Sequence, residues 1–241
     1  MDKKFDAVIS IGNLCASTEN LRKCQLQFYT YPIDWVAGGD IIHRTKLILN
    51  GCENLIKLES LEKFAENMLS RVPKHVCKNK ENQMVFNHDF PLHMTIEESF
   101  PAVKAKYDRR IARLKKHMSE SENILFVWID SIIAGTETPY EKFEEAFALI
   151  NEKFGTKASF LVLKNEAGRK FEDRIEKDYN ERFKCITFDY NGYAELPHIV
   201  NPKGIVKVFN RFRLNTKFIT PKNRIRRFFY YVRLFFTGQL W

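Results

Sequence analysis

The stretch FDAVISIGNLC, residues 5–15, decides the fold. Its apolar run, residues 5–11, predicts a short buried strand, and Gly12 ends that run. Ser17 and Thr18 then offer capping side chains for a helix that reaches about residue 24. A strand that turns directly into a helix is the repeating unit of α/β proteins, so we expect a chain of that class.

Three further apolar runs predict strands, and helices separate them. The runs are ILFVWI (residues 124–129), ASFLVL (158–163) and KCITFD (184–189). Helical spacing of apolar residues predicts helices over 40–50, 53–70, 101–118, 143–154 and 171–182, whereas residues 71–100 carry no regular pattern. This alternation favours a mainly parallel sheet of about four to five strands with helices on both faces. Functional residues gather where such strands end, which here means residues 12–15, 130–131, 164–166 and 189–190.

The composition is that of a globular protein. Apolar residues make up 44% of the 241 and charged residues 29%, with 10 Gly and 8 Pro, which excludes collagen-like and broadly disordered chains. No run of about 18 apolar residues predicts a membrane-spanning helix, and the first ten residues lack the apolar segment of a secretory signal. Five cysteines without paired spacing fit a reducing compartment, so we expect a cytoplasmic protein.

The positive charge is concentrated at the C-terminus. Ten of the 39 Lys and Arg residues follow residue 202, and no acidic residue does, so the rest of the chain holds 29 basic and 30 acidic residues. We therefore expect a single α/β domain over residues 1–202 and a basic extension over 203–241. Within the extension, residues 221–241 predict a basic amphipathic helix. It can lie on an anionic membrane surface, on the inner membrane face, or it can cover the domain; specific nucleic-acid binding is not expected.

Cys15 is the first candidate for chemistry. It stands at the N-terminal end of the first predicted helix, where free N–H groups and the helix dipole favour the thiolate and can bind an oxyanion. The alternative is a small buried cysteine that only packs. The remaining cysteines (24, 52, 77 and 185) show no metal-ligand spacing, and Gly12 alone falls short of a nucleotide-binding loop, so neither a metal nor a cofactor is expected.

His88, in the block NHDF (residues 87–90), is the candidate general base. A carboxylate that accepts a hydrogen bond from the second ring nitrogen can orient such a histidine. Asp89 and Asp34, the latter in the block YPIDW (31–35), are the two candidates for this carboxylate. A loop histidine and a helix-capping aspartate are the alternatives. His43, His75, His93 and His117 are predicted to lie at the surface, and His198 is a reserve base.

In their order along the chain, several blocks resemble a bacterial family of papain-like cysteine peptidases, otherwise of unknown function. The blocks are ISIGNLC (9–15), LR (21–22), YPIDW (31–35), NHDF (87–90), FPAV (100–103), KYDRRI (106–111) and LFV (125–127). The resemblance covers about residues 5–165, and the family's usual YPFDW is YPIDW here. Papain-like enzymes place the helix of the cysteine against an antiparallel sheet, which differs from the alternating α/β pattern predicted above.

The resemblance implies a cysteine hydrolase or acyltransferase that acts on a peptide, ester or glycan-linked substrate. His88 would deprotonate Cys15, and the thiolate would attack a carbonyl carbon. Backbone N–H groups near residues 14–16, with Asn13, would stabilise the oxyanion. Gly12 and Trp35 would complete the substrate site, with Asp34 or Asp89 behind the imidazole.

Two other functions stay open. One is an SGNH-type esterase, in which Gly12 and Asn13 follow the first strand and Asp189 and His198 complete the site. That reading lacks the expected serine, so Cys15 would have to replace it. The other, in which the link to glycans comes only from the resemblance to the family, is a non-catalytic accessory protein of cell-surface polysaccharide assembly, recruited to the membrane by its basic tail.

Overall fold

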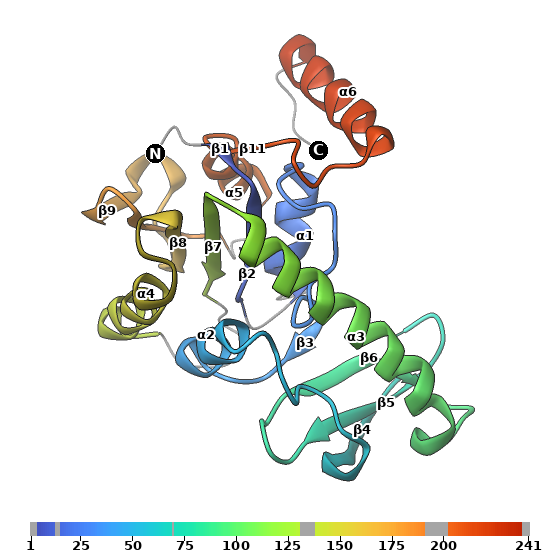
Figure 1. Cartoon of the computed structure of the whole chain (residues 1–241). Coiled ribbons are helices and arrows are strands. Elements are labelled where there is room, and N and C mark those ends of the chain that lie inside the picture. The colour runs from blue at the N-terminus through green and yellow to red at the C-terminus, as the bar shows by residue number, and fades with distance from the viewer. Residues whose placement is uncertain (1–3, 13–14, 69, 131–137, 191–201, 238–241) are drawn as a thin grey trace.

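The computed structural model describes residues 4–12, 15–68, 70–130, 138–190 and 202–237 (Figure 1). It is a mixed α/β structure with one five-stranded sheet, one four-stranded sheet and a two-stranded ribbon. Six helices lie in the described residues: α1 (Cys15–Lys23), α2 (Ile41–Leu49), α3 (Ile96–Glu120), α4 (Tyr140–Phe154), α5 (Pro202–Phe209) and α6 (Pro221–Thr237). None of the helices in this part of the chain is long and apolar enough to cross a membrane.

The five-stranded sheet is of mixed orientation. Its order is β2 (Ala7–Ser10), β7 (Ile124–Ile129), β8 (Ala158–Asn165), β10 (Phe183–Phe188) and β9 (Ile175–Asn180). The pairs β2–β7, β7–β8 and β8–β10 are parallel, and β10–β9 is antiparallel. The prediction of a helix over 171–182 was wrong. A short 3-10 turn, η4 (Phe171–Asp173), leads into β9 instead. This segment is a strand because it pairs with β10 and because Tyr179 stacks on Phe183, with ring centroids 4.1 Å apart.

The four-stranded sheet corrects a second expectation. It consists of β3 (Val36–Ala37), β6 (Val85–Pro91), β5 (Lys74–Asn79) and β4 (Leu61–Asn67), and all its pairs are antiparallel. A helix was expected over 53–70 and irregular chain over 71–100. Positive φ angles at Cys52 and Asn54 stop any helical continuation after α2. A 3-10 turn, η1 (Leu58–Ser60), then opens the meander beneath α3 (Figure 1).

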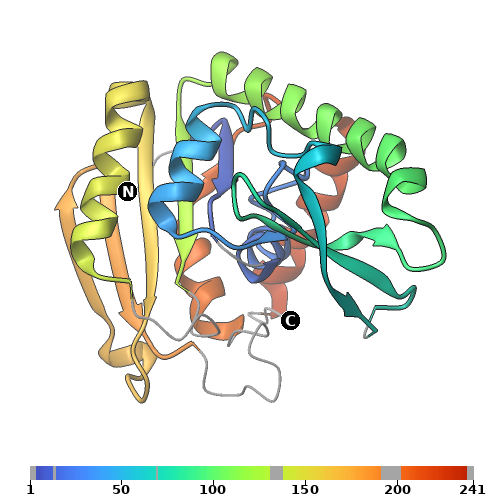
Figure 2. The same ribbon diagram turned by 90° about the horizontal axis from the view of Figure 1, so that it is seen from below.

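Two apolar cores cover the two faces of the five-stranded sheet, because successive side chains of a strand point to opposite faces. On one face Phe126 and Phe160 pack with residues of α2, α3 and α4, and Figure 2 shows α2 and α4 side by side. On the other face Leu125 and Leu161 pack with α1 and α5.

Part of the basic extension belongs to the second core. Ile205, Val208 and Phe209 are fully buried there, and β11 (Arg213–Leu214) pairs with β1 (Lys4–Phe5) in parallel. The domain boundary at residue 202 stays a prediction. The described part of the extension nevertheless contains both core residues and, in α6, a surface helix.

Arg44 of α2 holds the end of β2 against the segment that follows α1. Its side chain is fully buried and donates four hydrogen bonds to backbone carbonyls. The acceptors are the carbonyls of Ile11 (2.9 Å), Ile33 (3.0 Å), Val36 (3.0 Å) and Gly38 (2.8 Å). Burial lowers the pKa of Arg44 to about 9, so the guanidinium remains charged at neutral pH. One cation therefore fixes the end of β2 relative to the YPIDW block.

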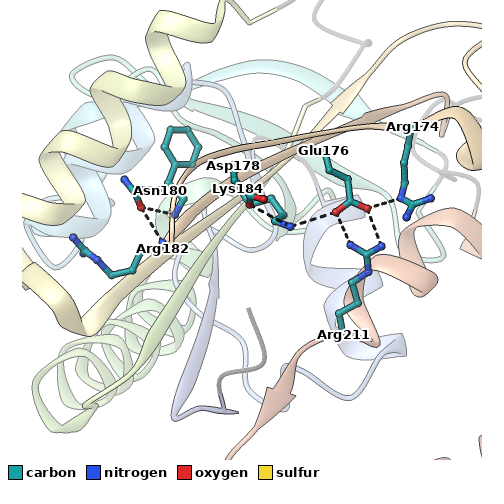
Figure 3. Close-up of polar contacts among 8 residues, drawn as sticks. Arg174, Glu176, Asp178, Asn180, Arg182, Lys184 and Arg211 are labelled. Carbon is teal, nitrogen blue, oxygen red and sulfur yellow. Dashed lines mark hydrogen bonds and ion pairs between the residues drawn. The ribbon is translucent and has the colours of Figure 1, made fainter.

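An ion cluster ties the chain after α5 to the edge strand β9 (Figure 3). Glu176 accepts two hydrogen bonds from Arg211, both 2.8 Å, and one of 2.6 Å from Arg174. Lys184 of β10 lies 3.3 Å from Glu176 and 3.2 Å from Asp178. Charged side chains on an edge strand also oppose pairing with another chain.

We expect Arg44→Met to lower the free energy of unfolding by about 3 kcal/mol or more, because it removes the donors of four buried carbonyls. Urea unfolding monitored by circular dichroism measures the change. Lys46→Met, at an exposed position of the same helix, is the matched control and should change stability little. Equal losses in the two variants would contradict the role given to Arg44.

We expect the free energy of unfolding of Glu176→Gln to fall less steeply than that of the wild type as the pH is lowered. Hydrogen bonds from Arg211 lower the pKa of Glu176 from 4.5 to about 2. The stability it contributes is therefore present above pH 4.5 and is lost as the pH falls from 4.5 toward 2. With solvent screening, the contribution is about 1 kcal/mol. Urea unfolding at several pH values, with Glu181→Gln in the adjoining turn as control, measures it; the same pH slope in both variants would refute the assignment.

Candidate functional site

Cys15 is the first residue of α1 and differs from the other cysteines in exposure. All five cysteines are described: Cys24, Cys52, Cys77 and Cys185 are buried, and Cys15 is partly exposed. The backbone N–H groups of Cys15 and Ala16 act to lower the pKa of its thiol and so favour the thiolate. A carbonyl oxygen bound at the same N–H groups would be stabilised as it gains negative charge.

The helix N-terminus does not lower the pKa of the Cys15 thiol below its ordinary value. Burial raises the pKa of Cys15 above its ordinary value, and the negative charge of Glu19, one helical turn away, raises it further. These two effects exceed the contribution of the two N–H groups. The thiol is therefore protonated at neutral pH, and its reaction needs a base.

Gly12 allows α1 to begin close to the end of β2. A Cβ atom at Gly12 would lie 2.9 Å from Cβ of Ser17 and 3.1 Å from its Oγ, closer than side chains pack. The glycine thus lets the first turn of α1 approach the strand. Asn13, expected to assist oxyanion binding, lies outside the described residues.

Asp34 is buried beneath α1 and is held by backbone and side-chain donors. Its carboxylate accepts hydrogen bonds from the Tyr31 backbone N–H at 2.7 Å and from Gln27 Nε2 at 3.1 Å. Burial raises the pKa of Asp34 to about 6, although these donors and the charge of Arg22 oppose the rise. The group is mostly ionised at neutral pH and fixes the turn before Trp35.

Trp35 is in contact with both α1 and β6. The guanidinium carbon of Arg22, in α1, lies 5.7 Å from the centroid of the indole ring. The exposed His88 imidazole, on β6, meets the same indole edge to face, with ring centroids 6.4 Å apart. The helix that begins with Cys15 and the strand that carries His88 therefore contact one side chain. Within the described part of the chain, no hydrogen bond joins Cys15 to His88.

Asp89 is directed to α3. It forms an ion pair with Lys106 and accepts a hydrogen bond of 2.8 Å from the Tyr107 hydroxyl. Among the residues described, neither Asp89 nor Asp34 is hydrogen-bonded to His88. Their roles as orienting carboxylates stay predictions.

The residues of the esterase alternative are placed only in part. Asp189, beyond the end of β10, accepts a hydrogen bond of 2.7 Å from the Gly168 backbone N–H, and His198 lies outside the described residues. A cavity of about 630 Å³ between the ends of α2, α3 and α4 is lined by none of the predicted site residues. No group of three His, Cys, Asp or Glu residues in the described chain is arranged to hold a metal ion.

His117, expected at the surface, is buried. Its ring stacks on Phe218 at 4.0 Å between centroids, and its Nδ1 lies 2.8 Å from the Tyr31 hydroxyl. Burial, with the charges of Arg113 and Lys116, lowers the pKa of His117 to about 4. The residue is therefore a neutral core histidine that joins α3 to the chain before α6.

Sequence reasoning missed two arginines that shape this region. Arg44 lies among Ile41 and Ile48 on the buried face of α2, and a charged residue on an apolar stripe was a signal available in the sequence. Arg22 had a weaker signal, since the last turn of a helix commonly carries a cation. Neither signal revealed the carbonyls or the indole that the two guanidinium groups contact.

Comparison with known proteins identifies relatives of the chain. Residues 6–152 match the family described as "Putative papain-like cysteine peptidase". An uncharacterized protein of Acanthamoeba polyphaga mimivirus is 26% identical over 204 residues, which cover 77% of this chain and 89% of the relative. No solved structure matches the chain. The resemblance to the family is confirmed; since this relative is viral, the bacterial origin and the cytoplasmic location stay predictions.

We expect Glu19→Gln to speed the alkylation of Cys15 by iodoacetamide about two- to threefold near pH 8, because removal of the negative charge lowers the thiol pKa. Mass spectrometry of peptides gives the rate for each cysteine. Glu141→Gln, in the first turn of α4, is the control and should leave the rate unchanged. A Cys15 rate that does not respond to Glu19 would show that the two groups are not coupled.

Proposed function

The chain belongs to this papain-like cysteine peptidase family, and we propose that it is a cysteine-dependent hydrolase or acyltransferase with Cys15 as its nucleophile. The observation that carries the proposal is the position of Cys15. It is the one partly exposed cysteine of five, and it is the first residue of α1, the helix that follows β2. Its own N–H and that of Ala16 lower the pKa of the thiol and so favour the thiolate. A reactive cysteine needs such access and such donors.

His88 is the proposed base. Because the thiol is protonated at neutral pH in this structure, a neutral imidazole must remove its proton when the substrate binds. The contact of Trp35 with Arg22 and with His88 keeps the helix and the strand adjacent. His88 lies on β6 of the antiparallel four-stranded sheet. Catalytic hydrogen bonds are often long without substrate and shorten in the complex.

The reaction follows from these roles. The Cys15 sulfur attacks a carbonyl carbon, and the N–H groups of Cys15 and Ala16 stabilise the oxyanion. The bond to the leaving group breaks, the leaving group takes the proton from His88, and a thioester remains on Cys15. Water or another acceptor then attacks the thioester and releases the acyl group. A peptide, an ester or a glycan-linked acyl group is a suitable substrate for this sequence of steps.

We expect the wild-type chain to gain the acyl mass on Cys15 when it is mixed with p-nitrophenyl or thioester acyl donors and quenched in acid. Intact and peptide mass spectrometry measures the adduct. Cys15→Ala should abolish it. His88→Ala should slow its formation by about 100-fold or more, because the base is lost. His93→Ala, an exposed histidine just after β6, is the matched control.

Other outcomes distinguish the alternatives. Loss of the adduct in His198→Ala with full activity in His88→Ala would favour the esterase site with Asp189. An adduct that survives Cys15→Ala would reject Cys15 as nucleophile. A folded wild-type chain that accepts no acyl group from any donor would favour the non-catalytic accessory role.

A further inference from the structure

The surface of α6 exposes three large apolar side chains. Ile225, Phe228 and Phe229 are 60%, 62% and 63% exposed. Their spacing of three and four residues places them on one face of the helix. Figure 1 shows α6 at the edge of the molecule, beyond α1 and away from both large sheets. Contiguous apolar side chains on a surface indicate a partner that covers them.

Cations surround this apolar face. The sequence of α6 contains Lys222, Arg224, Arg226, Arg227 and Arg233, and no acidic residue occurs from residue 203 to 241. Arg224 is exposed but is engaged locally, since it donates hydrogen bonds of 3.1 Å to the carbonyls of Ile219 and Thr216 in the turn before α6. Lys222, Arg226 and Arg233 are exposed, and their helical positions lie along one flank of the apolar face.

A cavity of about 460 Å³ continues the same surface between the end of α1 and α6. Phe229 and Tyr230 form its apolar wall, and Lys23, Arg226 and Arg233 contribute its charges. Gln25 completes the lining. An apolar wall with three cations at its rim complements a phosphodiester group joined to hydrocarbon.

We propose that α6 docks on the surface of an anionic phospholipid bilayer. Ile225, Phe228 and Phe229 enter the boundary between headgroups and acyl chains, and Lys23, Arg226 and Arg233 bind lipid phosphates. The positive charge of α6 favours an anionic bilayer over a second copy of the chain. Two copies that met through their α6 helices would bring two sets of cations together. A basic helix with one apolar face lies in the plane of the interface. The proposal does not depend on the chemistry of Cys15.

Co-sedimentation of the full chain with vesicles tests the proposal. We expect binding to vesicles of phosphatidylcholine mixed with phosphatidylglycerol, little binding to phosphatidylcholine alone, and weaker binding at high salt. F228S/F229S should weaken binding at least about tenfold, because apolar burial is lost. R226E/R233E should weaken it by a similar factor and reduce its dependence on salt. The second pair is exposed, so it tests the surface even if the first pair changes the fold.

The matched control is F64S/M68S, at and just after β4. Phe64 and Met68 are 64% and 62% exposed, about as much as the apolar residues of α6, but Phe64 lies on β4 and Met68 directly follows that strand. Binding should be unchanged in this variant. Equal binding to neutral and anionic vesicles, no binding to either, or unchanged binding in both α6 variants would overturn the proposal. So would a dimer in sedimentation velocity that F228S/F229S dissociates, since a second copy would then cover α6.

Discussion

The buried guanidinium of Arg44 is the constraint on which the site depends. It donates hydrogen bonds to the carbonyl of Ile11, just after β2, and to three carbonyls of the segment that contains Trp35. Backbone carbonyls inside a protein need hydrogen-bond donors, and Arg44 supplies donors to four carbonyls at this junction. One side chain therefore fixes where α1 starts and where the indole lies. The strand end that precedes Cys15 and the segment that carries Trp35 are therefore held together by this cation.

Burial around this junction has an electrostatic consequence for the thiol. Cys15 lies at a helix N-terminus, a position that by itself favours the thiolate, yet desolvation and Glu19 reverse the effect. A protonated thiol is protected from oxidation and unwanted alkylation until a base approaches. The same low-dielectric surroundings would strengthen the hydrogen bonds of the Cys15 and Ala16 N–H groups to an oxyanion.

Sequence patterns predicted well those strands and helices whose formation depends on residues close together in the chain. The runs over 124–129 and 158–163 are buried on both faces, so their composition alone indicates strands, and both are strands. The prediction of a helix over 53–70 was wrong for a non-local reason. Its leucines keep a helical spacing, but β4 exists because β5 offers hydrogen-bond partners, and most of its side chains are exposed. Spacing carries no information about a partner strand.

The sequence by itself determined the α/β class, the order of the family motifs and the place of Cys15 at the start of a helix. Each of these depends on residues close together in the chain. Only the tertiary structure decided that His117 is a core residue, that Asp89 pairs with Lys106, and that Trp35 contacts both Arg22 and His88. The physical reason is that burial and pairing depend on groups brought together from distant segments. A side chain's neighbours, and hence its charge state, are set when the layers pack.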